Sequence, residues 1–313
     1  MQKLKIGVIG AGYLGKFHAE KYSANKNVQL VGIADINFES ASKTAAKQNT
    51  KAYADYKQLI GKVDAVSIVV PTNLHFKVSL DFLSNGISTL IEKPITSTIQ
   101  EADQLINTAK KTGAIIQTGH LERFNPAIIA VKDKIKNPQF IEAHRLSFYK
   151  KRGTEVSVIL DLMIHDIDII FSLIDSGIKK IDAAGASVIS DYIDIANARF
   201  QFKNGAVANL TASRISAKNE RKMRIFQQNQ YTAIDFGNKN ATNITIDKNG
   251  KASDISPIPG AKIEKLPVLN QDALYAELDS FVNTILFNTP CVVDGNCGRK
   301  ALKAALEVIK QIK

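Results

Sequence analysis

Residues 4–15 read LKIGVIGAGYLG, an apolar run of strand length that ends in the spacing Gly-x-Gly-x-x-Gly. In this pattern the first glycine permits a tight turn, the second lets a pyrophosphate approach the backbone, and the third lets helix and sheet pack closely. The motif opens a segment with helical spacing, so a helix N-terminus faces the phosphates. The run therefore predicts a dinucleotide-binding loop. The expected contact residues are Gly10, Gly12, Tyr13, Leu14 and Gly15.

A carboxylate follows at the place where such a loop needs one. Asp35 ends the next apolar run and lies 20 positions after Gly15. A carboxylate there binds the ribose hydroxyls and repels the 2′-phosphate of NADP, and neither Ile36 nor Asn37 supplies a positive charge. The sequence predicts NAD as the cofactor. The alternative is a glycine turn followed by an ordinary aspartate at a strand end.

Strand-like and helix-like segments alternate through the first third of the chain. The apolar runs are LKIGVIG, VQLVGIAD, VDAVSIVV, ISTLIEKP and GAIIQTGH, separated by helical spacing at 14–24, 38–48, 74–85 and 98–111. This rhythm predicts an α/β fold, a doubly wound parallel sheet of the Rossmann type. After about residue 120, a helix-like stretch at 126–136 and a strand at 140–149 lead to a helix at 158–174. Strand-like runs then follow one another before two closing helices at 272–288 and 298–312.

Consecutive strands without helices between them indicate an open, largely antiparallel sheet, so the second half is expected to be α+β. We expect residues 1–120 to form the NAD-binding Rossmann domain. Residues 121–313 are expected to form a domain for substrate binding and oligomerisation. The length of 313 residues fits two such domains better than one.

Composition excludes several classes of protein. The formal charge is +11, but the lysines and arginines are scattered and form no nucleic-acid-binding motif, so no nucleic-acid partner is expected. No apolar stretch has the length of a membrane span. Cys291 and Cys297 have neither the spacing of a metal site nor that of a disulfide framework. The N-terminal apolar run is broken by glycines and lacks a signal-peptide cleavage pattern, which indicates a cytoplasmic protein.

Polar residues follow two strands of the predicted sheet, where ligands of doubly wound folds bind. Glu92 and Lys93 lie in IEKP (91–94), and PTNLHFKV (71–78) follows the preceding strand. Lys93 is expected over the nicotinamide, or else is a solvated loop lysine. The expected cofactor contacts here are Pro71, Thr72, His75, Glu92 and Lys93. For His75 alone, helix capping or surface packing is the stronger reading.

The stretch DLMIHDID (161–168) places three carboxylates and a histidine inside a very apolar segment, where such groups cost free energy unless they are partnered. In a helix, Asp161, His165 and Asp168 fall within about 60° of one another, while Asp166 points elsewhere. A histidine with a carboxylate one turn before it is a plausible proton-transfer pair. A buried polar network is an equal alternative.

GAGYLG, IEKP and DxxxHD together resemble the glucose–fructose oxidoreductase/inositol dehydrogenase/MocA family of two-domain NAD(P)-dependent enzymes. TGHLERFNPAI (118–128) and LDLMIHDIDI (160–169) look most like its nucleotide-sugar branch, notably the UDP-N-acetylglucosamine 3-dehydrogenases. Those enzymes supply a 3-keto sugar for amination toward lipid A or the cell surface. Many members have a glycine-rich run before the aspartate and a glycine two residues after it; this chain has TEVSVIL and Met163 there.

The resemblance implies a role for each matching residue. Lys93, Asp161 and His165 match the family's catalytic lysine, aspartate and histidine, and Pro94 is expected to follow a cis peptide bond. The implied reaction oxidises a secondary sugar hydroxyl, at C3 of UDP-N-acetylglucosamine, with NAD as hydride acceptor. His165 acts as general base oriented by Asp161, and Lys93 stabilises the developing negative charge.

Other residues and alternatives concern the substrate and the assembly. Arg123 in ERFNP and Arg152 in YKKRG are candidates for gripping a diphosphate, since arginine suits phosphate bidentately. An exposed strand end is the other explanation for YKKRG. The alternatives in function are a dehydrogenase of a free polyol or sugar, of the inositol type, and a non-catalytic NAD-binding regulator. The resemblance also implies a homodimer or homotetramer through the antiparallel sheet.

Overall fold

The computed structural model describes residues 3–150, 155–247 and 258–312. The chain divides into two compact units, one of Met1–Leu121 with Asp272–Leu302 and one of Glu122–Gln271 with Lys303–Lys313. The prediction placed 272–302 in the second domain. These residues pack with unit 1 instead, because helix α7 (Ala273–Phe287) puts Leu278, Phe281 and Val282 into the core of that unit.

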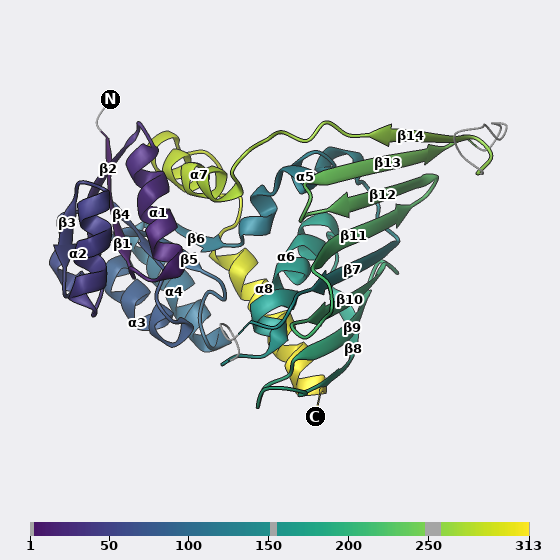
Figure 1. The fold of residues 1–313 in the computed structure, drawn as a ribbon, viewed down its shortest axis with the longest axis horizontal. Coiled ribbons are helices and arrows are strands. Elements are labelled where there is room, and N and C mark those ends of the chain that lie inside the picture. The colour runs from purple at the N-terminus through teal and green to yellow at the C-terminus, as the bar shows by residue number, and fades with distance from the viewer. Residues whose placement is uncertain (1–2, 151–154, 248–257, 313) are drawn as a thin grey trace. The chain divides into compact units, whose positions relative to one another are not determined.

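Unit 1 is built on a six-stranded parallel sheet in the order β3-β2-β1-β4-β5-β6 (Figure 1). Its strands are β1 (Leu4–Ile9), β2 (Val28–Ala34), β3 (Lys51–Tyr53), β4 (Ala65–Ile68), β5 (Ser88–Glu92) and β6 (Ile116–Gly119). The helices between them are α1 (Tyr13–Ala24), α2 (Phe38–Lys47), α3 (Thr72–Leu83) and α4 (Ile99–Thr112). The strand order reverses between β1 and β4, which is where ligands of doubly wound sheets bind. The predicted Rossmann fold is confirmed.

Local sequence explains the boundaries of these elements. Every residue of β4 is buried, as expected for a strand covered on both faces, and Ile6 and Val8 of β1 are fully buried beside it. Helix α4 begins with a capping box between Thr98 and Glu101 and ends at Gly113, whose φ of 76° suits a residue without a side chain.

Unit 2 is built on an eight-stranded sheet in the order β14-β13-β12-β11-β7-β10-β9-β8 (Figure 1). The strands are β7 (Phe140–Leu146), β8 (Ile178–Ala186), β9 (Ile195–Phe202), β10 (Val207–Ser213), β11 (Glu220–Gln227), β12 (Gln230–Asp235), β13 (Asn240–Ile246) and β14 (Ala261–Lys265). All neighbours pair antiparallel except β7 and β10. The expected α+β unit with a largely antiparallel sheet is therefore confirmed.

Two predicted helices take a different form. The stretch 126–136 is only a short α5 (Pro126–Ile129) followed by a 3-10 turn, Lys132–Lys134. Beyond this turn, the N–H groups of Lys136 and Asn137 donate to the side-chain oxygen of Gln227.

The predicted helix at 158–174 begins as a π-helix, η4 (Ile159–Met163), and becomes α6 (Ile164–Leu173). The N–H of Ile164 reaches back five residues to the carbonyl of Ile159. The expectation of 100° per residue therefore fails at Asp161, which lies in the π turn. Helix α6 packs against β7, and η4 packs against β10. Within the described part of the chain, no helix has the length and apolar character needed to cross a membrane.

Candidate active site

The glycine loop of unit 1 has the geometry that its spacing predicts. Gly10 has a φ of 102°, and a side chain there would collide with the backbone of Val69 in the neighbouring turn. A side chain at Gly15 would overlap the carbonyl of Gly10, whereas a Cβ at Gly12 would meet nothing within 4 Å. Helix α1 begins at Tyr13, so its first N–H groups lie at the loop. The open position at Gly12 leaves room for a phosphate beside the helix N-terminus.

Asp35 holds the far side of the same loop. Its Oδ2 accepts the N–H of Ala11 at 2.6 Å, and its Oδ1 accepts that of Asn37 at 2.8 Å. Ile36 between them is 92% exposed and uncharged. A carboxylate fixed in this way fits a ribose with two free hydroxyls and opposes a 2′-phosphate.

A cleft of about 520 Å³ lies over these residues. That volume is typical of a small-molecule site. Of the predicted cofactor contacts, it is lined by Gly10, Gly12, Asp35 and Pro71. Thr72 is the first residue of α3, directly after Pro71. Tyr13 borders a second hollow, between α1 and α2, and Leu14 is half-buried in α1. The loop, the carboxylate and the cleft fit NAD.

The structure buries His75 where a cofactor contact was expected. The ring is 1% exposed, with Nδ1 2.9 Å from the carbonyl oxygen of Pro94 and Nε2 2.9 Å from that of Val70. Burial lowers the pKa of His75, although the two carbonyls oppose that change. The expectation of a direct contact is corrected: His75 joins the turn after β4 to the turn after β5.

Lys93 lies in the turn that follows β5, and its peptide bond to Pro94 is cis, as the resemblance implied. Glu92 before it accepts a hydrogen bond from His18 of α1, with 3.1 Å between Oε1 and Nε2, and its Oε2 lies 3.3 Å from the N–H of Lys93. Burial raises the pKa of Glu92, but the hydrogen bond from His18 and the charge of Lys93 outweigh it, and the pKa lies below its usual value. Glu92 is thus ionised and links His18 of α1 to the start of the turn that carries Lys93.

In unit 2 the polar side chains of the stretch DLMIHDID differ in how deeply they are buried. Asp161 and His165 are half-buried, whereas Asp166 and Asp168 are 3% and 2% exposed. Both buried carboxylates meet arginines: Arg145 of β7 for Asp166, and Arg123 of the turn Leu121–Phe124 for Asp168. Asp168 therefore differs from Asp161 and His165, with which the helical spacing grouped it.

Of the predicted diphosphate contacts, Arg123 lies in unit 2. Arg123 has its Nε and Nη2 on Asp168, at 2.6 and 3.1 Å. Arg152 lies outside the described residues, and Lys150 next to that gap is exposed. Among the residues that the structure describes, no group of histidine, cysteine or acidic side chains could hold a metal ion.

Three residues of these networks escaped the sequence reasoning: His18, Arg145, and Glu122, which accepts a hydrogen bond from Nη1 of Arg145 at 2.7 Å. One of them left a signal. Strand β7 buries every second residue, and Arg145 follows Ile141 and Ala143 on the buried face. An arginine at a core-facing position of a strand requires a carboxylate partner.

Comparison with known proteins gives consistent matches over the whole chain. Residues 4–120 match the GFO/IDH/MocA model described as an oxidoreductase family with an NAD-binding Rossmann fold, and residues 128–230 match the GFO/IDH/MocA C-terminal domain. The chain is 40% identical to UDP-N-acetylglucosamine 3-dehydrogenase of Acidithiobacillus ferrooxidans, over 98% of this chain and 97% of that protein. It is 24% identical to myo-inositol 2-dehydrogenase of Thermotoga maritima, over 99% and 98% of the two chains.

A solved structure of the Acidithiobacillus ferrooxidans enzyme superposes with a TM-score of 0.95 and 39% identity, covering 100% of this chain and 98% of that one. Levoglucosan dehydrogenase in complex with NADH shares the fold at a TM-score of 0.87 and 18% identity, covering 99% and 97%.

Proposed function

Because the chain belongs to the GFO/IDH/MocA family of oxidoreductases, we propose that it oxidises the C3 hydroxyl of UDP-N-acetylglucosamine to a ketone with NAD. The observation that carries this proposal is the 40% identity, over nearly the full length of both chains, to an enzyme named for that reaction. The fixed carboxylate of Asp35 supports NAD over NADP.

The proposed chemistry gives each unit its own task. Bound NAD supplies the hydride acceptor. Unit 1 binds the cofactor through the glycine loop and Asp35 and contributes Lys93. Unit 2 contributes Asp161 and His165, and neutral His165 takes the proton of the substrate hydroxyl while the C–H bond of the same carbon loses its hydride. Asp161 favours the imidazolium that forms, and the ammonium group of Lys93 stabilises negative charge on the reacting oxygen.

Two competing functions make different demands. A dehydrogenase of a free polyol, as the inositol dehydrogenase relatives suggest, needs no diphosphate site. For the nucleotide sugar, Arg152 remains the proposed diphosphate ligand, since an arginine fork matches phosphate oxygens. A non-catalytic regulator would need NAD but no proton-transfer pair, so the presence of Lys93, Asp161 and His165 favours an enzyme.

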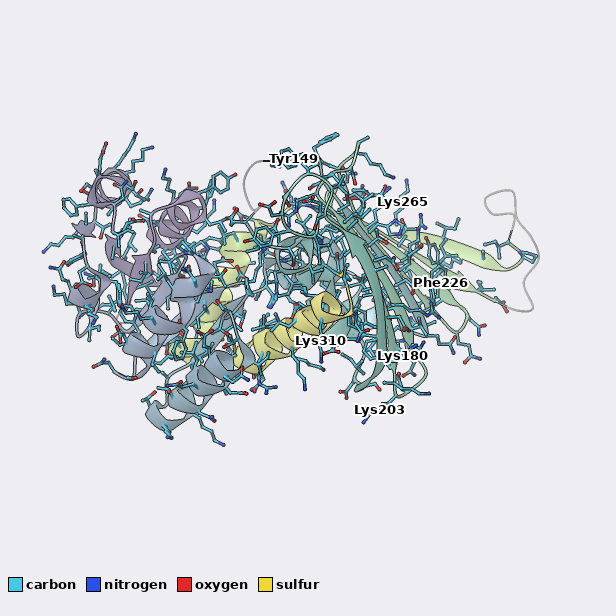
Figure 2. The ribbon with its side chains drawn as sticks, turned by 90° about the horizontal axis from the view of Figure 1, so that it is seen from below. Tyr149, Lys180, Lys203, Phe226, Lys265 and Lys310 are labelled. Carbon is cyan, nitrogen blue, oxygen red and sulfur yellow. The ribbon has the colours of Figure 1, made fainter. Side chains whose placement is uncertain are left out.

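The wider setting follows from the same proposal. A 3-keto nucleotide sugar is a substrate for amination, which supports a place in lipid A or cell-surface synthesis within the cytoplasm. Homo-oligomerisation through the eight-stranded sheet is supported by exposed apolar side chains on its strands. Phe226 of β11 is 38% exposed and Ile195 of β9 is 37% exposed. Figure 2 labels Phe226, together with Lys180 of β8 and Lys203 of the turn after β9.

The experiment is NADH formation by the purified protein with UDP-N-acetylglucosamine, N-acetylglucosamine, glucose and myo-inositol. A hydrazine present in the assay traps the ketone, because oxidation of an alcohol by NAD is uphill near neutral pH. Turnover with the UDP sugar alone supports the proposal. Turnover with myo-inositol would instead indicate a dehydrogenase of free polyols. NAD binding without turnover of any of these substrates would favour a non-catalytic regulator.

A further inference from the structure

Helix α6 carries two buried carboxylates close behind His165. Asp166 and Asp168 are 3% and 2% exposed, and each faces a guanidinium in a two-point arrangement. A buried charge without a partner is very costly, whereas a two-point ion pair also fixes direction. These pairs therefore constrain both the rotation and the axial position of α6.

The pair at Asp166 extends into a buried cluster. Arg145 donates Nε and Nη2 to Asp166, at 2.9 and 2.7 Å, and Nη1 to Glu122, at 2.7 Å. Asn125 donates to the other oxygen of Glu122 at 2.9 Å. The guanidinium lies 5.8 Å from the ring centroid of Phe236, which makes it a cation–π contact as well. Arg145 is only 3% exposed and thus joins β7, the turn at Glu122 and α6 in one network.

The charge balance of the cluster is tight. Two carboxylates face Arg145, and the partly exposed Arg221 lies 3.9 Å from Glu122. Burial raises the pKa of Asp166 despite the guanidinium. Burial also opposes ionisation of Glu122, but Arg145 and Asn125 outweigh it and hold the pKa of Glu122 below its usual value. The loss of either arginine charge would leave buried carboxylates uncompensated.

The pair at Asp168 uses the residue next to Glu122. The Nε and Nη2 of Arg123 lie 2.6 and 3.1 Å from the two oxygens of Asp168, and the arginine side chain is 14% exposed. Neighbouring residues of one short turn, Leu121–Phe124, therefore reach Asp168 directly and Asp166 through Arg145. Two of the three nitrogens of the Arg123 guanidinium, Nε and Nη2, therefore donate to a side chain of its own unit.

We propose that Arg145 and Arg123 are positioning residues for His165: they hold α6 through Asp166 and Asp168, and Arg123 binds Asp168 instead of the substrate's diphosphate. The inference deepens the proposed function and rests on it, because the role of His165 does. A displacement of about 1 Å at a reacting group lowers turnover by up to about 100-fold. Strong contacts that hold the helix carrying His165 are therefore expected to affect the rate.

The test is a double-mutant cycle of Arg123→Gln, Asp168→Asn and the two together, assayed with UDP-N-acetylglucosamine and NAD. We expect each single change to lower kcat by about tenfold or more with KM for the UDP sugar nearly unchanged, and the double variant to be no worse than the poorer single one. Arg123→Lys should restore only part of the rate. A KM raised about tenfold by Arg123→Gln, with Asp168→Asn unaffected, would overturn the proposal in favour of a diphosphate ligand.

A matched control is available in unit 1. Arg299 of helix α8 (Gly295–Gln311) makes a two-point ion pair with Asp103 of α4, and Arg299→Gln with Asp103→Asn should leave kcat unchanged. For the buried cluster, Asp166→Asn keeps the side-chain size, and Arg145→Lys keeps the positive charge but loses the two-point fork. Both variants should lower kcat and raise the isotope effect on kcat that is measured with the sugar deuterated at C3. The affinity for NAD should stay the same. An unchanged kcat in these variants, with the fold intact by NAD affinity, contradicts the role of Arg145.

A second readout separates this inference from the proposed function. Amide hydrogen exchange over 159–170 needs no substrate. It should be faster in Arg123→Gln and Asp168→Asn than in the wild type or in Arg299→Gln. If the wild type does not oxidise UDP-N-acetylglucosamine, the proposed function is wrong. Hydrogen exchange still tests whether the two ion pairs hold α6 in place. Exchange identical to that of the wild type overturns the pinning itself.

Discussion

The carboxylate of Asp35 at the end of β2 accepts the N–H of Ala11 in the glycine loop, with 2.6 Å between Oδ2 and the nitrogen. Its other oxygen is held by the N–H of Asn37 at 2.8 Å. The two bonds fix a negative charge where the fold is expected to place the adenosine ribose. The carboxylate therefore cannot turn aside to admit a 2′-phosphate without losing two backbone hydrogen bonds.

Replacing Asp35 should change the cofactor preference. Asp35→Ser is expected to raise KM for NAD about tenfold or more and to lower the ratio of NAD to NADP activity, because the ribose contact and the repulsion are lost together. Steady-state kinetics with both cofactors measure this. Asp55→Asn, at an exposed cap in the same unit, is the control. An unchanged NAD to NADP ratio in Asp35→Ser would refute the assignment.

Loss of the Lys93 ammonium should lower the rate of the chemical step without weakening the binding of NAD. Lys93→Met is expected to lower kcat by about 100-fold or more, because a positive charge at the reacting oxygen is removed. The Kd for NAD, measured by fluorescence titration, should change little. Lys110→Met, on the exposed side of α4, serves as the control. Wild-type turnover by Lys93→Met would remove Lys93 from the mechanism.

Asp161 and His165 should behave as one unit. His165→Gln is expected to lower kcat by about 100-fold to 10,000-fold, the usual contribution of a general base. Asp161→Asn should cost less, and the double variant should resemble His165→Gln, because Asp161 acts through the ring. Single-turnover kinetics on the three variants provide the measurement. Additive losses would show that the two residues act independently.

The acid stability of unit 2 should depend on Asp194, which is fully buried. Burial raises its pKa, but N–H groups of Ser190, Ile189 and Val188 outweigh it and place the pKa well below the usual value. Stability from a depressed pKa is present above the unfolded pKa of about 3.9 and is lost as pH falls toward the folded pKa. Asp194→Asn should therefore cost about 3 kcal/mol at pH 7 and flatten the pH dependence below pH 4.

Urea unfolding of the wild type and of Asp194→Asn between pH 7 and pH 3 measures this effect. Asp182→Asn is the control, since that carboxylate is exposed and pairs with Lys180 at the surface. Parallel stability curves for the wild type and Asp194→Asn would contradict the assignment. The region matters for the site because Ile193 accepts the N–H of Val158, directly before the π turn with Asp161.

Local signals in the sequence were sufficient for the glycine loop and the parallel sheet of unit 1. The glycine spacing, the strand before it and Asp35 are close in sequence, and the backbone conformation that each requires is determined locally. The structure confirms the loop, with Gly10 at a φ of 102° and Gly15 against Gly10. The parallel, doubly wound character of the sheet then follows from the alternation of strands and helices.

Long-range pairings were beyond the sequence. The apolar pattern of α7 predicts a helix but does not say which core receives Phe281. DLMIHDID shows four polar groups, yet the partners of Asp166 and Asp168 lie 21 and 45 residues away, at Arg145 and Arg123. No spacing of apolar and polar residues marks the π turn at Asp161 in the sequence. The spacing of an α-helix was therefore applied, and it grouped Asp161 with Asp168.

The most direct measurement uses UDP-N-acetylglucosamine with deuterium at C3 and follows the label. The account predicts that deuterium appears in the reduced nicotinamide, that its transfer is slower than that of hydrogen, and that the sugar product is a 3-ketone. Reduced cofactor without deuterium, formed from the same labelled sugar, would place the oxidation at another carbon. It would contradict the proposed reaction.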